Sequence, residues 1–197
     1  MGEETQDEKI ARVLKDRVAL VPWNPAWPVR FEEEKKHLME VAAPGLIVRI
    51  EHFGSTAVPG LTAKPVIDML IEVTCLEKTR ASLVPTLETE GYDYFWRPSH
   101  GEDAPPFYCW FIKRDATGQR SHHLHVMEGH FQQWERLLFR DYLIKFPRTS
   151  ADYLTLKQDL SARFPGDRIA YTQGKTEFVT RITALAKEDF KARESSK

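Results

Sequence analysis

The segment around residues 50–73 constrains the fold of this chain more than any other. Two stretches rich in branched residues, 46–53 and 66–73, predict strands, and a run of small residues connects them. Asp68 lies inside the second stretch, where a carboxylate is costly unless a cation or a metal ion meets it. A strand, a short loop and a second strand with one acid therefore predict a sheet that carries a polar site at this point.

The loop between these strands has the chemistry of a phosphate site. Gly54 and Ser55 offer backbone N–H groups and a hydroxyl, Thr56 follows them, and Lys64 adds a cation near the end of the loop. A phosphate-binding loop followed at this distance by an acid is typical of a nucleotidyl-transfer site. A tight turn between two core strands, with Asp68 satisfied by a neighbouring N–H, is the alternative that this pattern leaves open.

A second polar pattern lies in the stretch 121–126, which is expected to be a strand. Alternation places His123 and His125 on one face, about 7 Å apart, and points His122 the other way. Two such imidazoles can chelate a metal, bind a phosphate when protonated, or serve as acid and base. Arg120 precedes them and could pair with a phosphate. The polar face of an edge strand is the alternative.

The remaining elements indicate a mixed α/β (α+β) architecture with a helical C-terminal third. Residues 99–106 form a polar loop, and Ser150 and Asp167 are expected to cap helices. Further strands are expected at 92–96, 107–113 and 121–126, the last two forming a hairpin, and helices at 28–42, 76–90, 129–145, 150–163 and 167–193.

Composition indicates an ordinary soluble domain. With 197 residues and a net charge of −1, the chain can bury a sizeable core but has no field that would gather nucleic acid in general. No apolar run is long enough for a membrane span, and Cys75 and Cys109 are too few for a disulfide framework. We expect a cytoplasmic protein with a mobile lead-in at 1–17 and a single domain at 18–193.

The block from His52 to Asp68, which contains His-Phe-Gly-Ser-Thr-Ala-Val-Pro-Gly-Leu and Ala-Lys-Pro-Val-Ile-Asp, resembles the signature of the GrpB family. That family is classed with the nucleotidyltransferase superfamily by fold and by this motif. The resemblance covers about residues 18–186, with further matches at 21–31, 120–126, 139–143 and the Tyr153, Lys157, Tyr171 and Lys175 positions.

The resemblance implies a nucleotidyltransferase-like fold and the metal-dependent transfer of a nucleotidyl group from a nucleoside triphosphate to an unidentified acceptor. Mg²⁺ or Mn²⁺ is the expected ion, with Zn²⁺ as an alternative. We expect Asp68 and His125 to be catalytic and Asp68, His123 and His125 to hold the metal. The residues expected to bind the nucleotide, or another phosphorylated small molecule, are Gly54, Ser55, Thr56, Lys64, Arg120 and Lys175.

Two features keep other functions open. Active nucleotidyltransferases carry a second acid two residues after the first, where this chain has Leu70, and Glu72 lies roughly 13 Å along the strand from Asp68. A phosphohydrolase that uses His123, His125 and Asp68, or a nucleotide-binding module without catalysis, is therefore an alternative. Lys175 could clamp a phosphate or lie on a solvated helix face. The acceptor, the base preference and the oligomeric state are not predicted.

Overall fold

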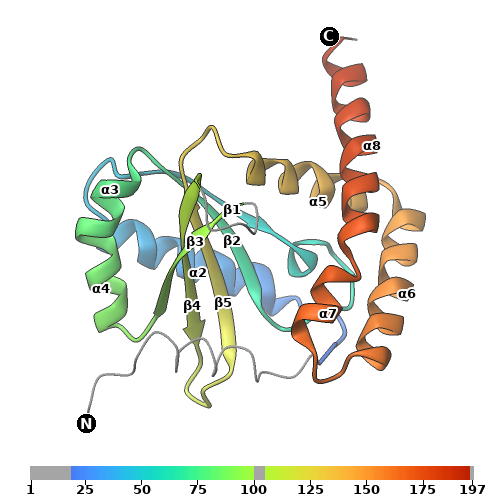
Figure 1. Ribbon diagram of the computed structural model, residues 1–197, viewed down its shortest axis with the longest axis horizontal. Helices are drawn as coiled ribbons and strands as arrows, with labels where there is room; N and C mark the ends of the chain where they lie inside the picture. Colours follow the sequence, from blue (N-terminus) through green and yellow to red (C-terminus); the bar gives the residue numbers. More distant parts are fainter. Residues whose placement is uncertain (1–18, 100–104, 196–197) are drawn as a thin grey trace.

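The computed structural model describes residues 19–99 and 105–195, and a five-stranded sheet forms its centre (Figure 1). The spatial order is β1-β2-β5-β4-β3, in which β2 and β5 run parallel and the other neighbours antiparallel. The expected mixed sheet is therefore confirmed. The strands are β1 (Ile47–Phe53), β2 (Ile67–Val73), β3 (Asp93–Pro98), β4 (Phe107–Arg114) and β5 (Arg120–Met127).

The parallel strands β2 and β5 lie inside the sheet and are its most buried pair. All eight residues of β5 are buried. In β2 the apolar side chains are buried, and only Asp68 and Glu72, on one face, are partly exposed. Parallel strands are usually covered on both faces, so a polar side chain here faces a site or a partner and not open solvent.

One face of the sheet is covered by α2 (Ala26–Val41), which lies behind the strands in Figure 1. This helix buries Trp27, Phe31 and Leu38, whose spacing gives one apolar stripe. The ring of Phe31 stacks on His52 of β1 at 4.8 Å between centroids. The pairing shows that the side chain of His52 faces α2, whereas its neighbour Phe53 faces the other side of the sheet.

The connection from β2 to β3 is helical, as expected, but it contains a π-helical turn. It consists of α3 (Leu76–Lys78), the π-helical turn (Thr79–Leu83) and α4 (Val84–Thr89). Pro85 lies in the first turn of α4, where its missing N–H is tolerated, so the helical path continues without a break.

The C-terminal third is helical, as predicted, and gathers at one side of the sheet (Figure 1). Val58 and Leu61, from the loop after β1, form a separate apolar cluster with Leu143 and Tyr153 from the helices. This cluster fixes the candidate phosphate loop to the helical third. The helices are α5 (Glu135–Lys145), α6 (Pro147–Arg163), α7 (Arg168–Gln173) and α8 (Thr176–Glu194).

Two expected helix starts are wrong. The helix expected at 129–145 begins as a 3₁₀ turn at Gln132–Trp134 and continues as α5. Ser150 caps no helix, because α6 already begins at Pro147, whose fixed φ suits a first turn.

The helix expected at 167–193 is two helices. Asp167 does cap α7, since its Oδ1 accepts a hydrogen bond from the Ala170 N–H at 2.9 Å. The chain then breaks at Gly174 and Lys175 before α8 begins. Lys175 therefore lies at a helix junction and not within a continuous helix.

The expected lead-in, residues 1–17, lies outside the described residues, as do residues 100–104 of the expected loop at 99–106. No helix in the described parts of the chain is both long and apolar enough to cross a bilayer.

The burial of β5 gives a direct stability test. Leu124 is fully buried, whereas Leu185 of α8 is 38% exposed. Leu124→Ala should lower the free energy of unfolding by about 2–5 kcal/mol, because it leaves a cavity in the sheet core. Leu185→Ala should change it by less than about 0.5 kcal/mol. Urea unfolding curves measure both values, and equal losses would contradict this placement of β5.

Candidate functional site

Gly54 directly follows β1 and brings the backbone close to Asp68 of β2. Its φ of +74° is one that side-chain-bearing residues rarely adopt. A Cβ at this position would also lie 2.5 Å from Oδ2 of Asp68. Glycine is therefore required here twice, by the backbone angle and by the close approach to the carboxylate.

The following 3₁₀ turn, Ser55–Ala57, carries two hydroxyl groups, those of Ser55 and Thr56, which have different roles. Thr56 is 1% exposed, and its Oγ1 lies 3.0 Å from Nε2 of His52 and 3.4 Å from the Val66 carbonyl oxygen. The Thr56 side chain thus holds the loop from inside. Ser55 is half-buried and hydrogen-bonded to Tyr153 of α6, so it is the hydroxyl that a ligand could reach.

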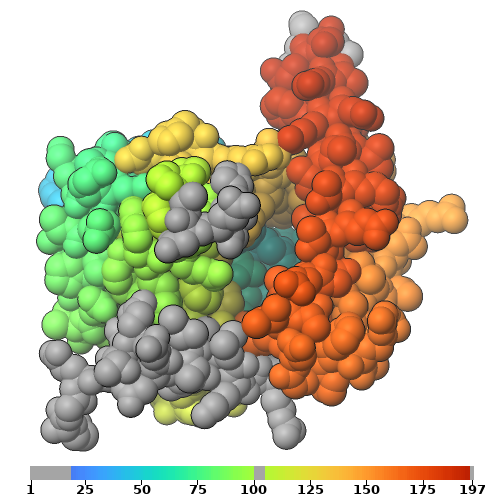
Figure 2. Space-filling view, viewed as in Figure 1, coloured from blue at the N-terminus to red at the C-terminus, as the bar shows by residue number. Residues whose placement is uncertain are grey.

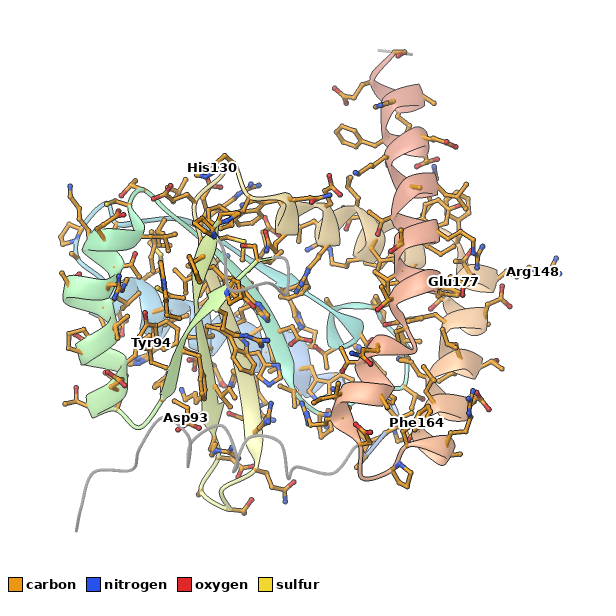
Figure 3. All side chains as sticks on the ribbon, in the orientation of Figure 1. Asp93, Tyr94, His130, Arg148, Phe164 and Glu177 are labelled. Carbon is orange, nitrogen blue, oxygen red and sulfur yellow. The ribbon has the colours of Figure 1, made fainter. Side chains whose placement is uncertain are left out.

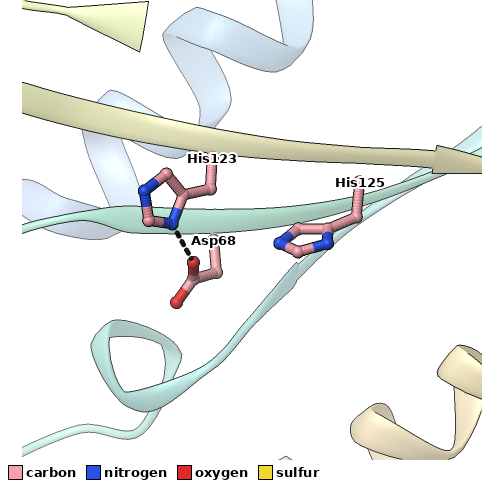
Figure 4. A group of neighbouring side chains, drawn as sticks. All are labelled: Asp68, His123 and His125. Carbon is pink, nitrogen blue, oxygen red and sulfur yellow. Dashed lines mark hydrogen bonds and ion pairs between the residues drawn. The ribbon is translucent and has the colours of Figure 1, made fainter. Parts of the chain in front are cut away.

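Asp68 and His123 form the centre of the site, and a second contact extends it to Arg120 (Figure 4). They are register partners of the parallel pair, and Nδ1 of His123 lies 2.9 Å from Oδ1 of Asp68. The other ring nitrogen, Nε2, lies 3.3 Å from Nη1 of Arg120. Nδ1–H therefore donates to the carboxylate while Nε2 accepts from the guanidinium. Both nitrogens of His123 are engaged.

The protonation states follow from these contacts. Burial lowers the pKa of His123 below its ordinary value, which keeps the imidazole neutral. Burial alone would raise the pKa of Asp68, but the hydrogen bond that His123 donates and the charge of the nearby Lys64 hold it below the usual range. Asp68 is therefore ionised at neutral pH, with its side chain 29% exposed.

His125 shares this face, with its ring centroid 6.5 Å from that of His123. Its ring stacks on Tyr108 at 5.7 Å and meets the edge of Phe53 at 5.3 Å. One ring nitrogen turns toward Asp68 and His123 and the other turns away (Figure 4). Burial holds the pKa of His125 well below its ordinary value, so the ring is neutral and able to ligate a metal.

Asp68, His123 and His125 could together hold a metal ion, since one ligand atom from each lies within 4.8 Å of the others. As arranged, His123 would first have to release Asp68 or Arg120, so Asp68 and His125 are the more available ligands. Glu72 cannot complete the set, because its carboxylate pairs with Arg49 at 2.5 Å. Leu70, at the position of the missing acid, is fully buried.

A second group with metal-type side chains lies elsewhere, at the end of β2. Ligand atoms of Cys75, Glu77 and Glu128 lie within 4.8 Å of one another. These groups already have partners, since Cys75 donates to Glu77 and Glu128 accepts from the Leu76 N–H at 3.0 Å. Glu128 therefore satisfies the first N–H of α3.

Positive charge surrounds Asp68. Lys64, at the end of the loop, and Lys175, at the α7–α8 junction, lie 5.2 Å and 4.7 Å from the ring centroid of Tyr171. Both ammonium groups also interact with the charge of Arg168. The charge of Asp68 acts on both, although no salt bridge is formed by either lysine among the described residues. One carboxylate thus faces a group of cations from separate parts of the chain.

This crowding changes the basicity of both lysines. Burial first, and then the like charges of Arg168 and the other lysine, lower the pKa of Lys64 to about 7. Burial lowers the pKa of Lys175 to about 8, with Arg168 and Arg136 adding to the effect and Asp68 opposing it. An anion at this position would relieve the repulsion and restore the positive charge of both groups.

The site lies in a hollow of the molecule. The space-filling view shows a depression between the sheet and helices α7 and α8, with residues of the β1–β2 region at its floor (Figure 2). Side chains ending in nitrogen gather between the sheet and α7 (Figure 3). The helical third therefore forms one wall of the hollow, as the lysine contacts on Tyr171 indicate.

Two buried or half-buried cations fasten this wall to the loop. Nζ of Lys157 donates to the Thr62 carbonyl oxygen, and burial lowers the pKa of Lys157 to about 7. Arg140 of α5 donates to the His52 carbonyl oxygen at 2.7 Å and pairs with Glu51 at 3.3 Å. Arg140 thus ties a helix to the sheet.

The structure brings the sequence-predicted site residues together, but the side chain of Thr56 does not face the site. Gly54, Ser55 and Lys64 of the loop border Asp68 or the cations around it, while the Thr56 side chain faces inward. His123 and Asp68 face each other, which confirms the expected order of the strands. Arg120 and Lys175 also reach the site, and their functional roles remain predictions.

Sequence reasoning missed three residues that border this face: Arg97, Trp110 and Arg136. Trp110 is the register partner of His125, and Arg97 lies over its ring at 4.7 Å. Strand alternation through residues 107–113 and the expected hairpin with 121–126 could have placed Trp110 beside β5, but the register that sets it opposite His125 does not follow from the sequence.

The family model described as "GrpB protein" matches residues 17–185. A UPF0157 protein of Pseudomonas aeruginosa is 43% identical over 175 residues, which are 87% of this chain and 68% of that protein. The glutamate-rich protein GrpB of Alkalihalophilus pseudofirmus is 34% identical over 171 residues, covering 86% of this chain and 96% of that protein.

A solved structure gives the same result for the fold. The crystal structure of the conserved protein GrpB from Enterococcus faecalis superposes with a TM-score of 0.75 at 31% sequence identity. The alignment covers 87% of this chain and 99% of the other. The names of these three proteins state no activity.

The close approach of Gly54 to Asp68 can be tested against a matched glycine. Gly60 has nearly the same φ, +78°, but a Cβ there would have no atom within 4 Å. Gly54→Ala and Gly60→Ala should both cost about 1–2 kcal/mol of backbone strain, and Gly54→Ala should cost more because its methyl group meets the carboxylate.

A double-mutant cycle with Asp68→Ala isolates this contact. Most of the excess cost of Gly54→Ala should disappear in the Asp68→Ala background, which removes the Oδ2 and Cγ contacts and keeps the Cβ contact at 3.1 Å. Urea unfolding measures it, and an excess that persists in full would mean that the loop does not press on the carboxylate.

Proposed function

This chain belongs to the GrpB family, and we propose that it binds a nucleoside triphosphate beside Asp68 and transfers a nucleotidyl group from it to an acceptor. The observation that carries this proposal is the single ionised carboxylate of Asp68 among several cations at a glycine-containing loop. The resemblance of the loop to nucleotidyltransferase motifs supports the same reading.

The cations favour a ligand with several negative charges. Lys64 and Lys175 form no salt bridge among the described residues, and both have lowered pKa values because they are buried and because like charge is crowded there. A triphosphate would neutralise both ammonium groups at once and accept hydrogen bonds from Ser55 and the loop backbone. A neutral small molecule would leave the repulsion unrelieved.

The donor set fits a divalent ion of intermediate softness. Asp68 and His125 would hold it, and one carboxylate with imidazole nitrogen suits Mn²⁺ or Zn²⁺ better than Mg²⁺, which prefers oxygen. When bound, such an ion would neutralise phosphate charge and orient the α-phosphate. His123 holds Asp68 in place through its Nδ1–H, while Lys64 and Arg120 bind and orient phosphate oxygens.

Two alternatives remain distinct from this proposal. A non-catalytic nucleotide-binding module is favoured by the buried Leu70 at the place of the second acid and by the engagement of Glu72 with Arg49. A phosphohydrolase with three protein ligands is less well supported, because both ring nitrogens of His123 already have partners.

Thermal unfolding with nucleotide and metal separates these readings. Millimolar ATP with Mn²⁺ should raise the melting temperature by several degrees, and neither component alone should do so fully. A metal response without nucleotide would favour the phosphohydrolase, and a nucleotide response indifferent to metal would favour the non-catalytic module.

Asp68→Asn provides the residue-level test, with Glu72→Gln as its matched control on the same strand and face. Asp68→Asn should abolish the metal-dependent part of the response, because it removes the carboxylate that would hold the ion together with His125. Glu72→Gln should keep it, since Glu72 already pairs with Arg49. A metal-dependent shift that survives Asp68→Asn would contradict the proposed role.

Nucleotide binding should take up protons at alkaline pH. The pKa of Lys64 is about 7 in the free protein, so this amine is mostly neutral at pH 8.5, and a bound phosphate would raise its pKa again. Affinity should therefore be greatest below about pH 7 and fall as pH rises, by up to about tenfold per pH unit for each proton taken up. Above about pH 7 the terminal phosphate is already ionised, so its own titration does not cause this fall in affinity.

Calorimetric titrations at pH 8.5 in two buffers of different ionisation enthalpy measure this uptake directly. Lys64→Met should reduce the number of protons taken up, whereas Lys36→Met, which changes an exposed lysine paired with Glu40, should not. Zero uptake by the unmodified protein, with binding intact, would mean that the lysine environment does not contact the phosphates.

A further inference from the structure

Two buried polar nitrogens on the site's face of the sheet have no hydrogen-bond partner among the described residues. They are Nε1 of Trp110 on β4 and Nδ1 of His125 on β5. Trp110 is 8% exposed and His125 is 9% exposed. The two residues are direct partners across the antiparallel pair. Buried N–H groups without an acceptor cost free energy, so such a pair calls for an occupant.

Both nitrogens act as donors when the site is in use. The indole Nε1–H can only donate. The ring nitrogen of His125 that faces Asp68 would take the metal, and a ligating imidazole carries its proton on the other nitrogen and donates it to a neighbouring acceptor. Figure 4 shows this second nitrogen turned away from Asp68. No acceptor among the described residues meets it.

The surroundings add positive charge and apolar walls, and no described residue offers an acceptor within hydrogen-bond distance of either nitrogen. The guanidinium of Arg97 lies 4.7 Å from the ring centroid of Trp110, and that of Arg136 lies 5.7 Å from the ring centroid of Phe53. The charges of both arginines act on His125. Both arginines are exposed, and neither has a carboxylate partner among the described residues.

We infer that this cluster, made of Arg97, Trp110, His125 and Arg136, is a subsite for an oxyanion of the acceptor substrate. Four donors or cations and no acceptor select a carboxylate or a phosphate group, because only an anionic oxygen satisfies both N–H groups and both guanidinium charges. The inference rests on the proposed function. It places the acceptor on the His125 side of Asp68.

The subsite opens by side-chain movement. Both orphan nitrogens are closed to solvent, and the long exposed side chain of Arg97 lies over Trp110. An arginine can exchange a cation–π contact for a paired anion without moving the backbone. The occupied and empty forms therefore differ mainly in the positions of Arg97 and Arg136, which explains why the strands can remain rigidly packed.

The indole N–H signals of ¹⁵N-labelled protein test this inference. The Trp110 signal is assigned as the one lost in Trp110→Phe. Inorganic phosphate and acetate, titrated separately, represent the two sources of the oxyanion, and sodium chloride controls for ionic strength. At least one oxyanion should shift the Trp110 signal saturably, and a preference of at least tenfold for one of them identifies the acceptor group.

Arginine variants complete the test. The Arg97→Gln, Arg136→Gln double variant should weaken the titrated oxyanion by at least tenfold. Arg80→Gln, which removes a guanidinium that lies over the ring of Trp96 on β3, should leave it within twofold. A Trp110 signal that does not move with either oxyanion, or an affinity unchanged in the double variant, would overturn the subsite.

The result is separable from nucleotide binding. The oxyanion titrations use no nucleotide, so a shift of Trp110 in a protein that fails to bind ATP would support the subsite while refuting the proposed donor. Conversely, ATP binding that depends on Lys64 and Asp68 without any response at Trp110 would support the donor site and refute the acceptor subsite.

Discussion

The arrangement of the site depends on the pairing of β2 with β5. Because these strands are parallel neighbours in the middle of the sheet, Asp68 stands directly beside His123, and Nδ1–H of His123 holds the carboxylate at 2.9 Å. A slip of one residue would turn the polar side chains of either strand to the face covered by α2. The apolar neighbours of these residues, which fill the core on that face, therefore fix the geometry of the site. The register of β2 on β5 therefore determines both the packing of the core and the geometry of the site.

The cations around Asp68 lower the free energy of unfolding, and an anionic ligand would remove this destabilisation. Lys64 and Lys175 have pKa values of about 7 and 8 because folding buries them beside Arg168. Between these values and the ordinary lysine pKa, the folded state binds fewer protons than the unfolded one, so stability from these two groups rises with pH. The penalty is fully present below about pH 7. A protein keeps such a cluster when an anion relieves it, and functional sites are where such perturbed groups concentrate.

The sequence specified local features well and long-range ones poorly. Strands 46–53 and 66–73, the role of Gly54 and the shared face of His123 and His125 follow from composition and alternation, which are local. The meeting of Lys64 with Lys175 over Tyr171 could not be predicted, because it requires the chain to break at Gly174 and α7 to fold back on the loop. Ser150 misled because a capping residue is a weaker signal than Pro147 in a first turn. Trp110 was missed because the register that sets it opposite His125 is a tertiary property.

The imbalance between one carboxylate and several cations also bears on how a metal would arrive. A divalent ion entering the empty site would meet the attraction of Asp68 alone and the repulsion of Lys64, Lys175 and Arg120, all of which act near that carboxylate. An ion already coordinated by a triphosphate carries net negative charge with it, and the same cations then attract the complex. The charge arrangement therefore favours delivery of the metal as a nucleotide complex over a resident ion. If a metal–nucleotide complex binds as proposed, the ligand's own phosphate oxygens would compensate for the acid that Leu70 replaces, and His125 would supply the protein's second contact to the ion.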